Sequence, residues 1–133
     1  MLKIFDPIFQ KNYYFIYTRT YLEYKRILKN KFNVDTELDE ECFGETEWVK
    51  EENIRGIVIW VRYTGDEYND NNSIGHEIRH AVTNMLEFCG LEQCEQTDEV
   101  FAYVSGYITA EIMRQVKQER EFFRIQDISK VIN

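Results

Sequence analysis

The sequence predicts an α+β fold in which a small sheet is packed by three helices. Two segments, Tyr13–Tyr17 and Ile54–Tyr63, are rich in β-branched and aromatic residues and favour strands. Three other segments place apolar residues at helical spacing, one after the first strand and two after the second. With a weaker strand between them, the order predicts a three-stranded sheet, mixed or antiparallel. One N-terminal helix and two C-terminal helices would cover it.

The first helix is expected within residues 18–32, directly after the strand Tyr13–Tyr17. Its apolar residues recur at helical spacing, and lysines and arginines occupy the other face. The periodic residues are Tyr21, Leu22, Tyr24, Ile27, Leu28 and Phe32. We expect the tyrosines of this region to pack inward.

Residues 33–47 are acidic and predict a solvated loop. They include seven Asp or Glu residues and no Lys or Arg, with Gly44 among them. A short strand near Thr46–Val49 would follow this loop. The next strand, Ile54–Tyr63, is apolar on both of its alternating faces, which predicts a central position in the sheet.

Two helices are expected in the C-terminal half. Asn72 or Ser73 can N-cap the first, which would run to Phe88, with Gly90 as the glycine that ends it. Thr97 can cap the second, which would run to about Phe123. Residues 125–133 are then expected to form a loose tail, and the 133 residues together make one domain.

Composition narrows the class of function. The net charge of −8 and the pI of about 4.8 lack the basic footprint of proteins that bind nucleic acid or anionic membranes. No apolar run is long enough for a signal peptide or a membrane helix. The odd number of cysteines indicates a reducing compartment, so we expect a cytoplasmic protein in which Cys89 and Cys94 are ordinary thiols.

The clearest chemical motif is His-Glu-x-x-His at residues 76–80, which contains both histidines of the chain. On a helix, residues four apart project from one face, so His76 and His80 could bind one metal ion. The residue types and spacing predict a zinc site, in which Zn²⁺ activates a water and Glu77 takes its proton as general base.

A catalytic zinc site usually has a third protein ligand, and Glu99 is the strongest candidate. On the last helix, Glu99 begins a stripe that contains small residues, which would let two helices approach closely around a shared metal. The stripe consists of Glu99, Ala102, Tyr103, Gly106 and Ala110. Asp98 is the alternative ligand, rotated by one residue on the same helix.

Two motifs resemble small zincin-like proteins encoded by tailed bacteriophages. These are HEIRH and, about twenty residues later, the Glu-x-x-Ala-Tyr signature at residues 99–103. A Gly-x-Thr element, here Gly44-Glu45-Thr46, and an apolar strand precede the motif in that group. The resemblance implies a minimal zincin-like fold, metallopeptidase activity, and action in the cytoplasm of an infected host.

The histidine pair with a downstream glutamate is also similar to the gluzincins. That similarity implies zinc ligation by His76, His80 and Glu99, with Glu77 as the base. Many gluzincins carry an aspartate four residues after the glutamate ligand, where this chain has Tyr103. The phenol of Tyr103 could orient a ligand, or it could donate to an oxyanion of the substrate.

Three hypotheses of function follow. The first is a zinc-dependent peptidase that acts on a protein or peptide, with an extended substrate aligned along residues 57–62 if that strand lies at the sheet edge. The second is a catalytically silent metal-binding phage protein, accessory or virion-associated, that acts through contacts with a host or virion protein. The third is a helical interaction domain without metal. Nucleic acid and membrane are not expected partners.

Overall fold

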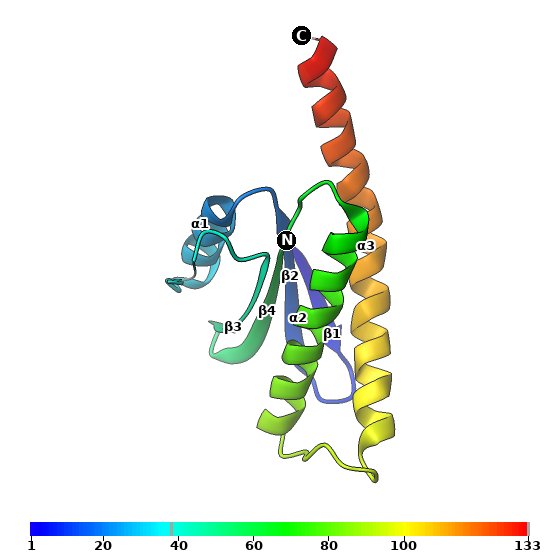
Figure 1. The fold of residues 1–133 in the computed structure, drawn as a ribbon. Coiled ribbons are helices and arrows are strands. Elements are labelled where there is room, and N and C mark those ends of the chain that lie inside the picture. The colour runs from blue at the N-terminus through cyan, green and yellow to red at the C-terminus, as the bar shows by residue number, and fades with distance from the viewer. Residues whose placement is uncertain (38, 133) are drawn as a thin grey trace.

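The computed structural model describes residues 1–37 and 39–132, and within them it shows one sheet flanked by helices on both faces (Figure 1). The described strands are β1 (Leu2–Asp6), β2 (Lys11–Thr18), β3 (Gly44–Glu51) and β4 (Ile54–Arg62). The described helices are α1 (Tyr21–Phe32), α2 (Glu67–Phe88) and α3 (Asp98–Ile132). The α+β class is therefore confirmed, and the described sheet has four strands where the sequence predicted three.

The sheet is mixed, with the strand order β1-β2-β4-β3. Strands β2 and β4 pair in parallel at its centre, and β1 and β3 pair antiparallel to them at the two edges. The central position predicted for β4 is confirmed. The strand that the sequence did not predict is β1, a short edge strand that buries Ile4 and Asp6 and exposes Lys3 and Phe5. Its one-sided burial leaves little apolar signal in five residues.

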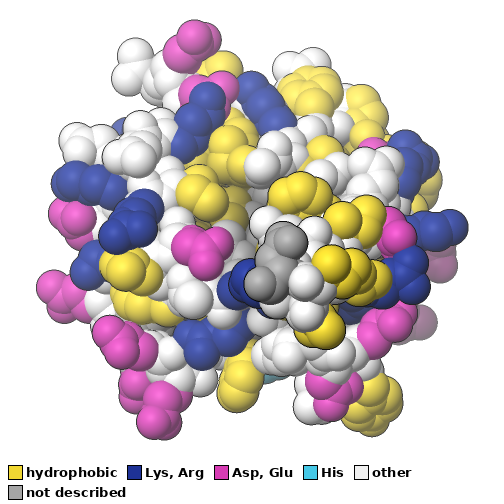
Figure 2. Space-filling view, turned by 90° about the horizontal axis from the view of Figure 1, so that it is seen from above, with side chains coloured by type: hydrophobic (Ala, Val, Ile, Leu, Met, Phe, Trp, Pro, Cys, Tyr) yellow, Lys and Arg dark blue, Asp and Glu magenta, His cyan; other side chains and the backbone are white. Residues whose placement is uncertain are grey.

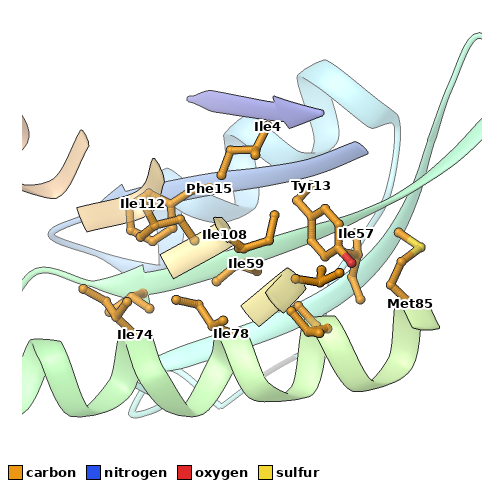
Figure 3. Packing of buried hydrophobic residues seen from close by; sticks show 14 of the residues in the cluster. Ile4, Tyr13, Phe15, Ile57, Ile59, Ile74, Ile78, Met85, Ile108 and Ile112 are labelled. Carbon is orange, nitrogen blue, oxygen red and sulfur yellow. The ribbon is translucent and has the colours of Figure 1, made fainter. Parts of the chain in front are cut away.

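The two central strands are buried on both faces because helices cover both sides of the sheet. One set of alternating side chains packs against α2 and α3 (Figure 3): Tyr13, Phe15, Tyr17, Ile57, Ile59 and Val61. The opposite set packs against α1: Tyr14, Ile16, Val58 and Trp60. On that side the ring of Tyr24 stacks on Trp60 with centroids 4.6 Å apart.

Helix α2 begins at Glu67, and its N-cap Asp66 lies nearly two turns before the predicted N-cap, Asn72 or Ser73. Asp66 is the N-cap, and its side chain accepts a hydrogen bond from the backbone N–H of Asn69. The polar first turn is held in place by Asp70, which is 1% exposed and accepts from Tyr17 and Thr64. The helix ends at Phe88 as predicted, followed by Gly90 with φ +91°.

Helix α3 begins after Thr97 as predicted but runs to Ile132. Residues 125–132 are helical, so the expected loose tail is wrong there, and residue 133 lies outside the described residues. Arg19 Nη2 supports the extension, because it donates to the carbonyl of Phe123 at 3.1 Å and to Asp127 Oδ1 at 2.8 Å. None of the described helices has the length and apolar composition required to cross a membrane.

Replacing Asp70 tests how the ends of β2, β4 and α2 are joined. We expect Asp70→Ala to lower the free energy of unfolding by about 3 kcal/mol, because it leaves the Tyr17 and Thr64 hydroxyls without their acceptor. Urea denaturation measures the change, with Glu87→Ala on the exposed side of α2 as a control that costs less than about 0.5 kcal/mol. Equal effects of the two substitutions would contradict the role given to Asp70.

Candidate metal centre

Helix α2 presents the His-Glu-x-x-His motif between the core and solvent. Its buried face carries residues at helical spacing that pack on the sheet: Ile74, Ile78, Ala81, Val82, Met85 and Leu86. His76 and His80 lie on the solvent side of the same helix, and Glu77 is buried. The local spacing therefore gives the motif the arrangement that the sequence predicted.

The two histidine side chains converge on one point. The Nε2 atoms of His76 and His80 lie 3.1 Å apart, and their rings meet edge to face with centroids 4.6 Å apart. Ligands at about 2.0–2.1 Å from a tetrahedral zinc ion lie roughly 3.3 Å from each other. The nitrogen pair is therefore close to the separation at which both could bind the same ion.

Glu77 lies beside this pair but in a different environment. The residue is 8% exposed, and its Oε2 accepts a hydrogen bond of 2.7 Å from Thr46 Oγ1 in β3. Its other oxygen, Oε1, lies 3.9 Å from Nε2 of His76. One oxygen is thus held by the sheet, and the other faces the point where the histidines converge.

The first residue of β3 completes the surroundings of Glu77. A side chain at Gly44 would place its Cβ 2.9 Å from Cγ of Glu77 and 3.0 Å from the carbonyl oxygen of Trp60. Only glycine leaves room for the glutamate at this position. The sequence had marked Gly44 and Thr46 as a family element, but nothing local in it indicated their contact with α2.

A shallow cavity of about 290 Å³ opens at this point between α2 and the start of β3. It is lined by His76, Glu77, Cys42, Phe43, Gly44, Asn72 and Ser73. A second cavity of about 430 Å³ shares Phe43, Asn72 and Ser73 with the first and extends toward the N-terminus of α2. A ligand bound at the histidine pair would therefore have room along this side of α2.

Glu99 is not brought to the histidine pair. Helices α2 and α3 form an antiparallel hairpin in Figure 1, and Glu99 lies in the first turn of α3, at the connected end. His80 lies roughly 12 Å along the axis of α2 from that end. The described residues contain no group of three His, Cys, Asp or Glu side chains that could hold a metal ion.

The packing argument that selected Glu99 is wrong. Every residue of the small-residue stripe is exposed, and a Cβ at Gly106 would meet no atom within 4 Å. The larger apolar side chains set the rotation of α3 instead: Phe101, Val104, Ile108, Ile112 and Val116 are buried. Since these lie on the opposite side of the helix, Glu99, Asp98 and Tyr103 face solvent, and Tyr103 is 62% exposed.

The site residues present fit a zinc ion in part. His76 and His80 supply two nitrogen ligands of the kind zinc prefers, and Glu77 supplies a carboxylate next to them. Cys42, in the lining of the cavity, is a free and half-buried thiol. The remaining coordination positions would be left to solvent, to a substrate or to a residue that moves on binding.

Comparison of the chain with protein-family models, with curated proteins and with solved structures found no match.

The opposite face of β3 carries two carboxyl groups, Glu45 and Glu47. Glu45 accepts hydrogen bonds from the hydroxyls of Tyr24 and Thr36. Burial, and then the nearby Glu45, raise the pKa of Glu47 above its ordinary value of 4.5. Folding therefore takes up a proton at Glu47 at pH values between the unfolded and folded pKa, and this term makes the fold less stable as pH rises through that window.

The substitution Glu47→Gln should stabilise the protein at about pH 7, because it removes a carboxylate that is disfavoured in the fold. The gain should shrink as pH falls and disappear below the unfolded pKa of about 4.5. Urea denaturation between about pH 7 and pH 4 measures it, with Glu37→Gln in the exposed acidic loop as the control. A gain that does not depend on pH would contradict the assignment.

Measurements of metal affinity test whether Glu99 is a ligand, as the sequence predicted, or lies away from the metal, as the structure indicates. We expect Glu99→Gln to bind Zn²⁺ within about twofold of the wild type, and His76→Ala to lose at least about 100-fold, because only the histidine lies at the converging pair. Competition with a chromophoric chelator measures both. A loss at Glu99→Gln comparable to that at His76→Ala would show that α3 supplies a ligand after all.

Proposed function

We propose that this chain is a zinc-dependent metallopeptidase in which His76 and His80 hold the ion and Glu77 is the general base. The observation that carries the proposal is the convergence of two histidine nitrogens, 3.1 Å apart, beside a buried glutamate. Both residue types match the requirements of zinc-assisted hydrolysis.

Each side chain has a separate task in this proposal. When bound, zinc supplies a Lewis acid that lowers the pKa of water and polarises a carbonyl group. The imidazoles of His76 and His80 would each bind it through one neutral ring nitrogen. Glu77 takes a proton from the attacking water through Oε1 and delivers it to the leaving amine.

The edge strand β3 is the element best placed to hold an extended substrate. The sequence had raised residues 57–62 for this role, but β4 lies at the centre of the sheet, between β2 and β3. The outer side of β3 forms no pair with another described strand, and its first residue, Gly44, lines the cavity beside His76 and Glu77. A peptide added along β3 would pass close to the base.

The substrate class that suits this surface is a protein or peptide. The face in Figure 2 carries Lys and Arg side chains interspersed with Asp and Glu, without a continuous basic area. With a net charge of −8, the chain is proposed to act on protein substrates in the cytoplasm, which would be the host cytoplasm for a phage protein.

The second candidate is a metal-binding protein that lacks turnover and acts through protein–protein contacts, as a phage accessory or virion protein. The observation that favours it is the end of α3, where apolar side chains lie exposed beyond the last buried residue, Phe123. They are Ile125, Ile128, Val131 and Ile132. Exposed apolar groups at this density are typical of contact surfaces.

Replacing Glu77 separates the two candidates. We expect metal-loaded Glu77→Gln to lose at least about 100-fold in hydrolysis of unfolded protein substrates, because the amide cannot take a proton, while zinc affinity stays within about threefold. Fluorescence release from labelled, denatured protein measures the activity, and chelator competition measures the affinity. Zinc binding without cleavage by the wild type on diverse substrates would favour the second candidate.

A further inference from the structure

The two oxygens of Glu77 have different neighbours, which divides their roles. Oε2 accepts from Thr46 Oγ1 at 2.7 Å. Oε1 lies on the side of His76, 3.9 Å from its Nε2. A glutamate has three side-chain torsions, so its carboxylate would sample several positions unless one oxygen were fixed.

We infer that Thr46 is a positioning residue for the proposed reaction. Its hydroxyl anchors Oε2 of Glu77, so that Oε1 is the oxygen that meets the water and takes its proton. The inference rests on the proposed function for its consequence in catalysis. Its structural content, that Thr46 fixes the side chain of Glu77 in one conformation, stands independently of turnover.

The hydroxyl of Thr46 has one proton and two acceptors on Glu77. It lies 2.7 Å from the carboxylate Oε2 and 3.2 Å from the backbone carbonyl oxygen. The shorter contact is to the charged acceptor, and hydrogen bonds to charged groups are the stronger ones. The hydroxyl of Thr46 therefore donates its hydrogen bond mainly to the carboxylate of Glu77, which is the group that must be held in place.

Gly44 confines the side chain of Glu77 from a second position on β3. Because a Cβ there would lie 2.9 Å from Cγ of Glu77, the backbone of β3 touches the aliphatic part of the glutamate. Pairing of Gly44 with Val61 and of Thr46 with Ile59 fixes both residues on the central strand β4. A rigid sheet thus holds the base from two sides, in the manner expected of a preorganised site.

A purely structural role for Thr46 would be to satisfy a buried carboxylate. Such a role predicts lower stability on its loss, without a selective effect on the chemical step. A positioning role predicts that kcat falls while KM and zinc affinity do not change, because substrate and metal contact other groups. The isosteric substitution Thr46→Val removes the hydroxyl, and Thr46→Ser keeps it.

The kinetic test compares these two variants with Thr36→Val, which removes a hydroxyl bonded to Glu45 on the opposite face of β3. We expect Thr46→Val to lower kcat by about 10- to 100-fold, the effect of a misplaced catalytic group. Thr46→Ser should stay within about threefold of the wild type, and Thr36→Val should leave kcat unchanged. A wild-type kcat in Thr46→Val overturns the inference, as does a loss in Thr46→Ser equal to that in Thr46→Val.

A second measurement tests the anchoring of Glu77 by Thr46 without requiring catalytic activity. Three-bond NMR couplings of the Glu77 side chain report whether it holds one rotamer or averages over several. We expect a single rotamer in the wild type and Thr46→Ser, and averaged couplings in Thr46→Val. Equal couplings in the wild type and Thr46→Val overturn the inference. If the metal-loaded wild type cleaves nothing, the proposed function fails, and the couplings still decide whether Thr46 anchors Glu77.

Discussion

The contact between Glu77 and the first residues of β3 is the constraint on which the site depends. It brings a carboxylate to the boundary between core and solvent, where Thr46 can hold one of its oxygens at 2.7 Å. Once Glu77 is fixed inward, the helical period places His76, one residue before it, and His80, three residues after it, on the exposed side of α2. The buried anchor and the exposed nitrogen pair are therefore consequences of a single rotation of α2.

That rotation is set by the sheet. Parallel pairing of β2 and β4 makes a centre that is buried on both faces, and α2 packs on it through residues such as Ile74 and Ile78. The antiparallel edge strand β3 then places Gly44 beside Glu77, where no larger residue fits. Strand β3 thus joins the core to the site and leaves its outer side free of other described strands.

Local patterns in the sequence predicted the α+β class, the central β4 and the shared face of His76 and His80, because each depends on helix or strand periodicity. The early start of α2 and the late end of α3 were not predicted, because they depend on hydrogen bonds between residues far apart in the sequence. Asp70 holds the start of α2, and Arg19 supports the far end of α3. The place of Glu99 depended on the rotation of α3. There the buried stripe of large apolar residues outweighed the small residues that had suggested a close helix contact.

Metal content is the most direct measurement of the central claim, that the two histidines share an ion. Elemental mass spectrometry would be applied to the wild type, His80→Ala and Glu77→Gln, each supplied with zinc and then dialysed. The account predicts about one zinc per chain in the wild type and Glu77→Gln and none in His80→Ala, because the nitrogens 3.1 Å apart are the ligands. A wild type without zinc, or a His80→Ala protein that retains it, would contradict the account.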